Sequence, residues 1–85
     1  MDEPTNEQRA DWAYLALERF AKATGQDASG DLQHDQEIVV SDLLCGLMHL
    51  CERDGIDFKR CLANGRGNFN EETDATDEAD EAAER

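Results

Sequence analysis

Four side chains that can bind a metal lie along one apolar stretch of the sequence. They are spaced i, i+3, i+7 and i+10, close to one face of a helix: Asp42, Cys45, His49 and Glu52. Carboxylate, thiolate and imidazole groups together can hold a transition metal such as zinc. One helix cannot close a tetrahedral site, however, and the sequence has no C-x-x-C or H-x-x-x-H pairing. The stripe is more typical of a semi-polar seam between helices, and we predict no metal and no other cofactor.

The other nucleophiles and bases lack partners at a useful spacing. Cys51 and Cys61 flank a tight turn, where they are either two small buried side chains or the halves of a regulatory disulfide. His34 has only acidic neighbours, and neither Ser29 nor Ser41 lies in a nucleophile-elbow motif. We therefore predict that the chain is not an enzyme.

The elements that position these residues are predicted to be helices. Thr5 and Gln8 have the spacing of a capping box, and Gly25 is typical of a helix end, so a first helix is expected over about 6–24. The segment from Gln26 to His34 is rich in turn-forming residues and is expected to be a linker. A second helix over about 36–54 would then start at the N-cap Asp35.

The segment around Gly55 predicts a short connection between two helices. Gly55 can adopt the left-handed conformation that ends a helix, and Asp57 is a good N-cap for the next one. The third helix is expected over about 58–68. The predicted buried positions of the three helices are Ala10, Ala13, Ala16, Leu17, Phe20 and Ala21; Val40, Leu43, Leu44, Leu47, Leu50 and Cys51; and Phe58, Cys61, Leu62, Gly65 and Phe69.

Beyond Phe69 the apolar pattern stops and acidic residues take over. Residues 70–85 hold eight acids against one arginine, a net charge of −7, while residues 1–69 carry −6. Such a composition predicts disorder. The expected architecture is therefore all-α: a small three-helix domain over 1–69 and a disordered acidic tail over 70–85.

Size, charge and cysteine content suggest where the chain resides and what it binds. A core built from so few residues gives marginal stability, which a homodimer or another bound partner would raise. The net charge of −13 repels nucleic acid and anionic membranes and favours a basic protein as partner. The N-terminus lacks the pattern of a signal peptide, no apolar stretch is long enough to cross a membrane, and three cysteines suit a reducing compartment. Cytoplasmic residence is expected.

Two groups of residues are candidates for protein binding. Trp12 and Leu15 lie off the apolar stripe of the first helix and widen its apolar surface. The acids of the tail could dock on a surface rich in lysine and arginine, although most such tails serve only as solubilising extensions. The predicted protein-binding residues are Trp12, Leu15, Glu71, Glu72, Asp74, Asp77 and Glu78.

Part of the sequence resembles a known enzyme family. The stretches Ser41-Asp42-Leu43-Leu44 and Gly55-Ile56-Asp57-Phe58, followed by Leu62, look like an element of the all-α nucleoside-triphosphate pyrophosphohydrolases (MazG-like). In that family an acid-bearing helix ends in a Gly-Ile-Asp turn, and two E-x-x-E/D motifs hold magnesium. The resemblance covers about a quarter of the chain and implies a related helical scaffold.

The metal motifs of that family are not matched. Asp42 is the only acid in register, because the position three residues before it is Val39 and the position three residues after Glu18 is Ala21. We therefore do not transfer the activity. A divergent pyrophosphohydrolase-related protein, without activity, is the alternative hypothesis.

Taken whole, the chain is also similar to the short acidic accessory proteins of bacterial plasmids, integrative elements and phages. Some of these proteins inhibit a nucleic-acid-binding protein by occupying its basic surface. This resemblance implies a non-enzymatic protein-binding module, which is our leading hypothesis.

Overall fold

The computed structural model of the chain describes residues 3–74 and contains only helices there. In order, these are α1 (Asn6–Thr24), α2 (Asp31–His34), α3 (Gln36–Asp54) and α4 (Phe58–Thr73). The predicted all-α class is confirmed. The bounds of α1 and α3 agree with those expected from the sequence, whereas α2 and the end of α4 differ.

Local capping chemistry sets both ends of α1. The Thr5 hydroxyl accepts from the Gln8 backbone N–H at 3.0 Å, and the Gln8 side chain accepts from the Thr5 N–H at 2.8 Å, which completes the capping box. At the other end Gly25 has a φ of 81°, and the Gln26 N–H donates to the Ala21 carbonyl at 2.8 Å. This is the helix ending that a glycine favours.

The connection between α3 and α4 is as short as predicted. Gly55 has a φ of 72°, and the Ile56 N–H donates to the Cys51 carbonyl at 2.9 Å. Directly afterwards, the Asp57 carboxylate accepts from the Arg60 N–H at 3.1 Å and caps α4. One residue in the left-handed conformation and one acidic cap thus turn the chain between two long helices.

The predicted linker and the predicted Asp35 cap were both partly wrong. The linker contains the single-turn helix α2, which follows Gly30 at a φ of 93° and buries Leu32. The Asp35 side chain makes no capping hydrogen bond, because this residue joins α2 directly to α3 and its own N–H donates to the Asp31 carbonyl at 2.7 Å. Burial of one leucine favours a helical turn where the local sequence favours a loop.

The core lies where α1, α2 and α3 meet. Its buried members are Leu17, Ala21, Leu32 and Val39, with Phe20 and Leu43 packed against them. The helices α1 and α3 approach closely at Gly46, where an added Cβ would lie 3.4 Å from Cε1 of Phe20. Val39, which the sequence analysis did not place in the core, is fully buried.

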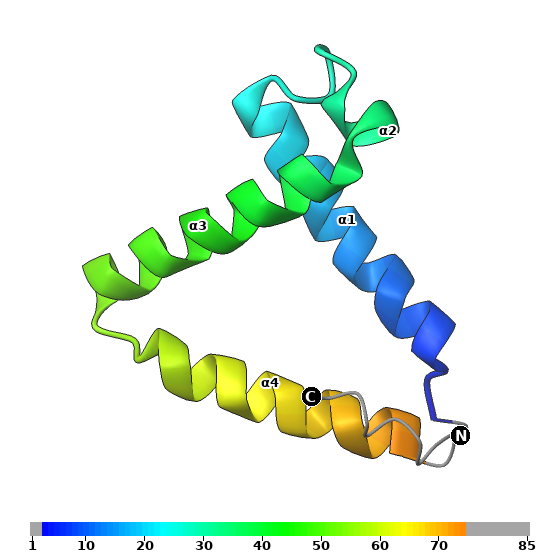
Figure 1. Cartoon of the computed structure of the whole chain (residues 1–85), viewed down its shortest axis with the longest axis vertical. Helices are drawn as coiled ribbons and strands as arrows, with labels where there is room; N and C mark the ends of the chain where they lie inside the picture. Colours follow the sequence, from blue (N-terminus) through cyan, green and yellow to red (C-terminus); the bar gives the residue numbers. More distant parts are fainter. Residues whose placement is uncertain (1–2, 75–85) are drawn as a thin grey trace.

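Much of the predicted core is exposed, and this is the main correction to the sequence analysis. Figure 1 shows α1, α3 and α4 as three sides of a triangle, with α2 at the corner between α1 and α3. Because α1 and α2 cover only the first part of α3, four predicted core residues of α3 remain 38–46 % exposed: Val40, Leu44, Leu47 and Leu50. On α1, Ala10, Ala13 and Ala16 are exposed as well. None of the residues of α4 is buried.

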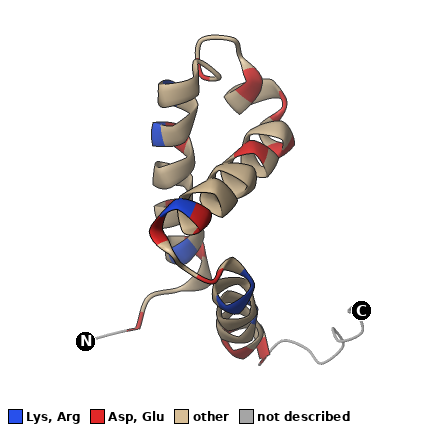
Figure 2. Cartoon of the chain, turned by 90° about the vertical axis from the view of Figure 1, so that its left-hand side faces the viewer, with Lys and Arg blue, Asp and Glu red and all other residues tan. Residues whose placement is uncertain are grey.

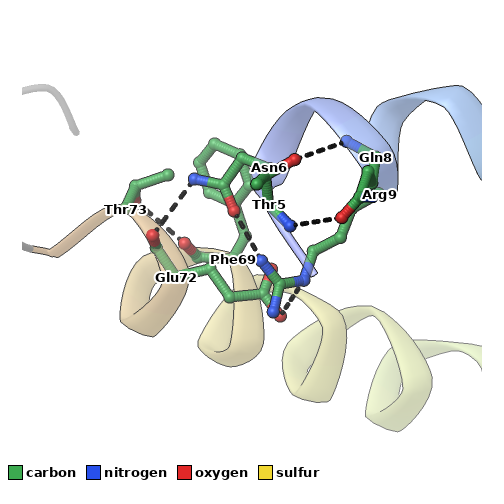
Figure 3. Close-up of polar contacts among 7 residues, drawn as sticks. All are labelled: Thr5, Asn6, Gln8, Arg9, Phe69, Glu72 and Thr73. Atoms are coloured by element: carbon green, nitrogen blue, oxygen red, sulfur yellow. Dashed lines mark hydrogen bonds and ion pairs between the residues drawn. The ribbon is translucent and has the colours of Figure 1, made fainter. Parts of the chain in front are cut away.

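The last corner of the triangle joins the start of α1 to the end of α4. Asn6 donates from Nδ2 to the Glu72 carbonyl at 3.1 Å, and Arg9 Nε lies 3.3 Å from Glu72 Oε2 (Figure 3). The Thr73 hydroxyl donates to the Phe69 carbonyl at 2.9 Å. With these contacts α4 continues to Thr73 rather than ending near residue 68, so residues 70–73 belong to the helix and not to a tail. The rest of the predicted tail, residues 75–85, lies outside the described residues.

Candidate functional site

The stripe of possible metal ligands on α3, which we predicted to be a semi-polar seam between helices, is exposed instead. All four of its side chains lie on the surface: Asp42, Cys45, His49 and Glu52. Asp42 Oδ2 accepts from Gln26 Nε2 at 2.8 Å, so it forms a polar contact with the segment after α1. Within residues 3–74, no three His, Cys, Asp or Glu side chains are grouped so that they could hold a metal ion. Helical spacing alone therefore does not bring these ligands together.

The three cysteines are free thiols in different environments. Cys51 is buried, whereas Cys45 and Cys61 are exposed. Burial raises the pKa of the Cys51 thiol, and nearby Cys61, Asp54 and Asp57 raise it further. Cys51 lies in the last turn of α3 and Cys61 in the first turn of α4, on either side of the connection at Gly55. Formation of a regulatory disulfide stays a hypothesis.

The structure reveals an apolar groove that the sequence analysis missed. We call it the α3–α4 groove; its volume is ≈ 450 Å³, and it is lined by Leu44, Leu47, Phe58, Cys61, Leu62, Gly65, Arg66 and Phe69. Arg66 is its one charged lining residue. The signal was present as the apolar stripe of α4, but sequence periodicity cannot tell a stripe that packs in its own core from one that stays open.

Trp12 and Leu15 form a second exposed apolar surface, on α1. Their exposed fractions are 56 % and 61 %. Because they are three residues apart they are neighbours on the helix. Asp11, four residues before Leu15, and Glu18, three residues after it, lie beside Leu15 as well. The core residue Leu17 points elsewhere. The prediction that Trp12 and Leu15 lie off the buried stripe of α1 is confirmed.

The acidic residues predicted to bind a partner have different surroundings. Glu71 and Glu72 are exposed, but Glu72 is paired with Arg9. Asp74 is the C-cap of α4. Asp77 and Glu78 lie outside the described residues. Of the described acids in this group, Glu72 therefore contributes to the fold.

Charge is unevenly distributed along the described chain. Residues 23–52 contain six acidic residues and no lysine or arginine, whereas residues 58–70 contain three basic residues and no acid. Figure 2 shows the acids of α2 and the start of α3 near the top, and the basic residues of α4 near the bottom. In the described part of the chain, the ion pairs are Arg9–Glu72 and Arg53–Asp54, so none of the acids of residues 23–52 is ion-paired there.

Two further observations bear on the function: the search for membrane-spanning helices and the comparison with known proteins. Among the helices of the described part, none combines the length and the apolar character needed to cross a membrane. Comparison of the chain with protein-family models, with curated proteins and with solved structures found no match in any of the three.

Proposed function

We propose that the chain is a non-enzymatic protein-binding module, whose partner is a basic protein. The observation that carries this proposal is a pair of exposed apolar side chains on α1 of a small, strongly acidic chain. Trp12 is 56 % exposed and Leu15 is 61 % exposed, and they are neighbours on one helix. An exposed apolar patch rimmed by polar residues marks an interaction surface.

The surface around Trp12 and Leu15 is our candidate contact for that partner. Tryptophan is enriched among the residues that contribute most to binding, and here it stands next to a leucine that is equally accessible. Asp11 and Glu18 flank Leu15 and would face lysine or arginine on the partner. The net charge of −13 would speed association with a basic surface.

The resemblance to accessory proteins of mobile elements suggests the class of partner. A nucleic-acid-binding protein carries a basic surface for phosphate groups, and an acidic protein can compete for it. An inhibitor that occupies such a surface is therefore the form of the proposal that we favour.

A salt-graded affinity experiment tests this function. The full chain would be immobilised, and partners would be captured from the native host at low and at high salt. We expect capture of basic proteins that weakens with salt and is lost in the variant Trp12→Ala/Leu15→Ala. Capture of the same proteins by this variant, or binding unaffected by salt, would contradict the proposal.

An enzymatic assay separates the alternative hypothesis from this one. Magnesium-dependent release of pyrophosphate from a panel of nucleoside triphosphates would support the pyrophosphohydrolase-related alternative. We expect no such release, because Asp42 is the only acid matching the metal motifs and its carboxylate already accepts from Gln26.

A further inference from the structure

We propose that a second copy of this chain occupies the α3–α4 groove and that the protein is a homodimer through this face. This inference does not depend on the basic partner proposed above, because it concerns the inner faces of α3 and α4 rather than the Trp12–Leu15 surface of α1.

The first argument is that the described part of the chain leaves much of the apolar face of α4 uncovered. Its apolar residues recur at i, i+4 and i+11, as Phe58, Leu62 and Phe69, a stripe typical of a helix packed in a core. Leu62 is nevertheless 47 % exposed and Phe69 61 % exposed, and no residue of α4 is buried. The structure thus contains half of an interface between helices.

The exposed area is close to what a stable dimer needs. A standard interface buries about 800 Å² on each partner, of which somewhat more than half, or about 450 Å², is apolar. Five apolar residues that face the groove or extend its α3 side are 38–61 % exposed: Val40, Leu44, Leu47, Leu62 and Phe69. These five half-exposed side chains would supply a large share of that apolar area.

Charge favours a second copy over a basic partner at this face. Arg66 is the charged residue of the groove, and Lys59 and Arg60 lie on the same helix, whose acids, Glu71 and Glu72, are confined to its last turn. A partner for this face should therefore be acidic near Arg66, and the chain itself is acidic. The acids of α2 and of the first part of α3 lie at the far end of the molecule (Figure 2), beyond the reach of α4 in the same copy.

A two-fold axis would satisfy both requirements at once. In an isologous dimer each contact occurs twice, so the basic first part of α4 in each copy can face acids of α2 and α3 in the other while the apolar stripes pack together. The small core of one copy would then be completed by the other, which fits the marginal stability expected for a domain of this size.

The test is the oligomeric state of the full chain and of two matched variants. Phe69 and Leu15 are both 61 % exposed, but Phe69 lines the groove and Leu15 lies on α1 outside it. We expect sedimentation equilibrium to show a dimer for the unaltered chain and for Leu15→Asp. For Phe69→Asp we expect at least a tenfold higher dissociation constant, with helicity retained in circular dichroism.

A second groove variant shows whether loss of the dimer comes from the groove or from misfolding of the Phe69→Asp variant. Because Phe69 lies near the α1–α4 contact, Leu62→Asp, in the middle of α4, should weaken the dimer equally. The melting temperature of the unaltered chain should rise with its concentration, and that of both groove variants should not. Arg66→Glu should weaken a dimer of acidic copies, whereas it would tighten binding of a basic partner to the same groove.

Three results would overturn the dimer. The first is an unaltered chain that stays monomeric at all concentrations. The second is a Phe69→Asp variant that dimerises as well as the Leu15→Asp variant. The third is a Leu15→Asp variant whose dimer dissociates although its groove is unchanged. The outcome is also separable from the proposed function. Leu15→Asp should lose the basic partner and keep the dimer, so each proposal can fail without the other.

Discussion

Arg9 at the start of α1 and Glu72 at the end of α4 lie 3.3 Å apart, between Nε and Oε2 (Figure 3). Asn6 joins this contact twice: it donates to the Glu72 carbonyl at 3.1 Å and accepts from the Arg9 guanidinium at 2.9 Å. These contacts connect the two ends of the described chain. They hold the far end of α4 beside the start of α1.

The first prediction concerns this contact. Glu72→Gln removes the ion pair, and we expect the unfolding free energy to fall by no more than about 1 kcal/mol, because both side chains are partly exposed. Hydrogen exchange of residues 69–73 should accelerate, since this end of α4 loses its anchor. Glu71→Gln is the matched control, because the adjacent carboxylate forms no ion pair in the described structure. Equal exchange in the two variants would contradict the role of Glu72.

The second prediction compares two aspartates at helix starts. Asp57 accepts a backbone hydrogen bond at 3.1 Å, whereas the Asp35 side chain makes no capping bond. We expect Asp57→Ala to lower the unfolding free energy by about 1 kcal/mol and Asp35→Ala to lower it by only a few tenths. Urea unfolding of both variants, followed by circular dichroism, measures the difference. A larger loss for Asp35→Ala would mean that its side chain caps α3 in solution.

These two aspartates also show how far the sequence predicts this fold. Helix ends depend on contacts within a few residues, so the capping box at Thr5, the glycine endings at Gly25 and Gly55 and the cap at Asp57 could be predicted. Asp35 looked equally good as a cap. Its side chain is not used, because α2 runs directly into α3, and that helix depends on burial of Leu32 against distant residues.

Burial could be predicted much less well than helix position. The sequence shows apolar stripes on α3 and α4, and such a stripe indicates that one face of a helix is more stable when it is covered. It does not indicate which element or molecule covers that face. In this chain, α1 and α2 cover Val39 and Leu43, while Leu47 and Leu62 line an open groove. For the same reason, the spacing of Asp42, Cys45, His49 and Glu52 could not show whether these side chains lie in a seam between helices or on the surface, where they are found.

The third prediction concerns thiol reactivity. The pKa of Cys51 is raised by burial and by nearby Cys61, Asp54 and Asp57. A raised pKa leaves less thiolate at a given pH, so we expect Cys51 to react with iodoacetamide more slowly than exposed Cys45 and to need a higher pH. Mass spectrometry of partly alkylated protein, taken at several pH values, measures each site. Labelling of Cys51 as fast as Cys45 near neutral pH would contradict the buried environment.

The raised pKa of Cys51 also predicts in which direction the stability of the fold changes with pH. The folded state holds the Cys51 proton more tightly than the unfolded state does, so this contribution to stability is complete below the ordinary cysteine pKa of about 8.5. It is lost as the pH rises through the higher pKa of the folded state. We expect the unfolding free energy to fall in alkaline solution, and Cys51→Ala to show a smaller fall than the unaltered chain.

The last prediction compares one substitution at two glycines. At Gly46 an added Cβ would lie 3.4 Å from the Phe20 ring, an ordinary contact, and the backbone is helical. Gly46→Ala should therefore raise the unfolding free energy by up to about 1 kcal/mol, because alanine favours a helix over glycine. At Gly55 nothing lies within 4 Å, but the φ of 72° is unfavourable for alanine. Gly55→Ala should lower the unfolding free energy by about 1 kcal/mol through the backbone alone. Thermal unfolding of both variants at one protein concentration measures whether each substitution raises or lowers stability. If Gly46→Ala destabilises the protein, α1 and α3 must pack more closely at Phe20 in solution than the 3.4 Å contact indicates.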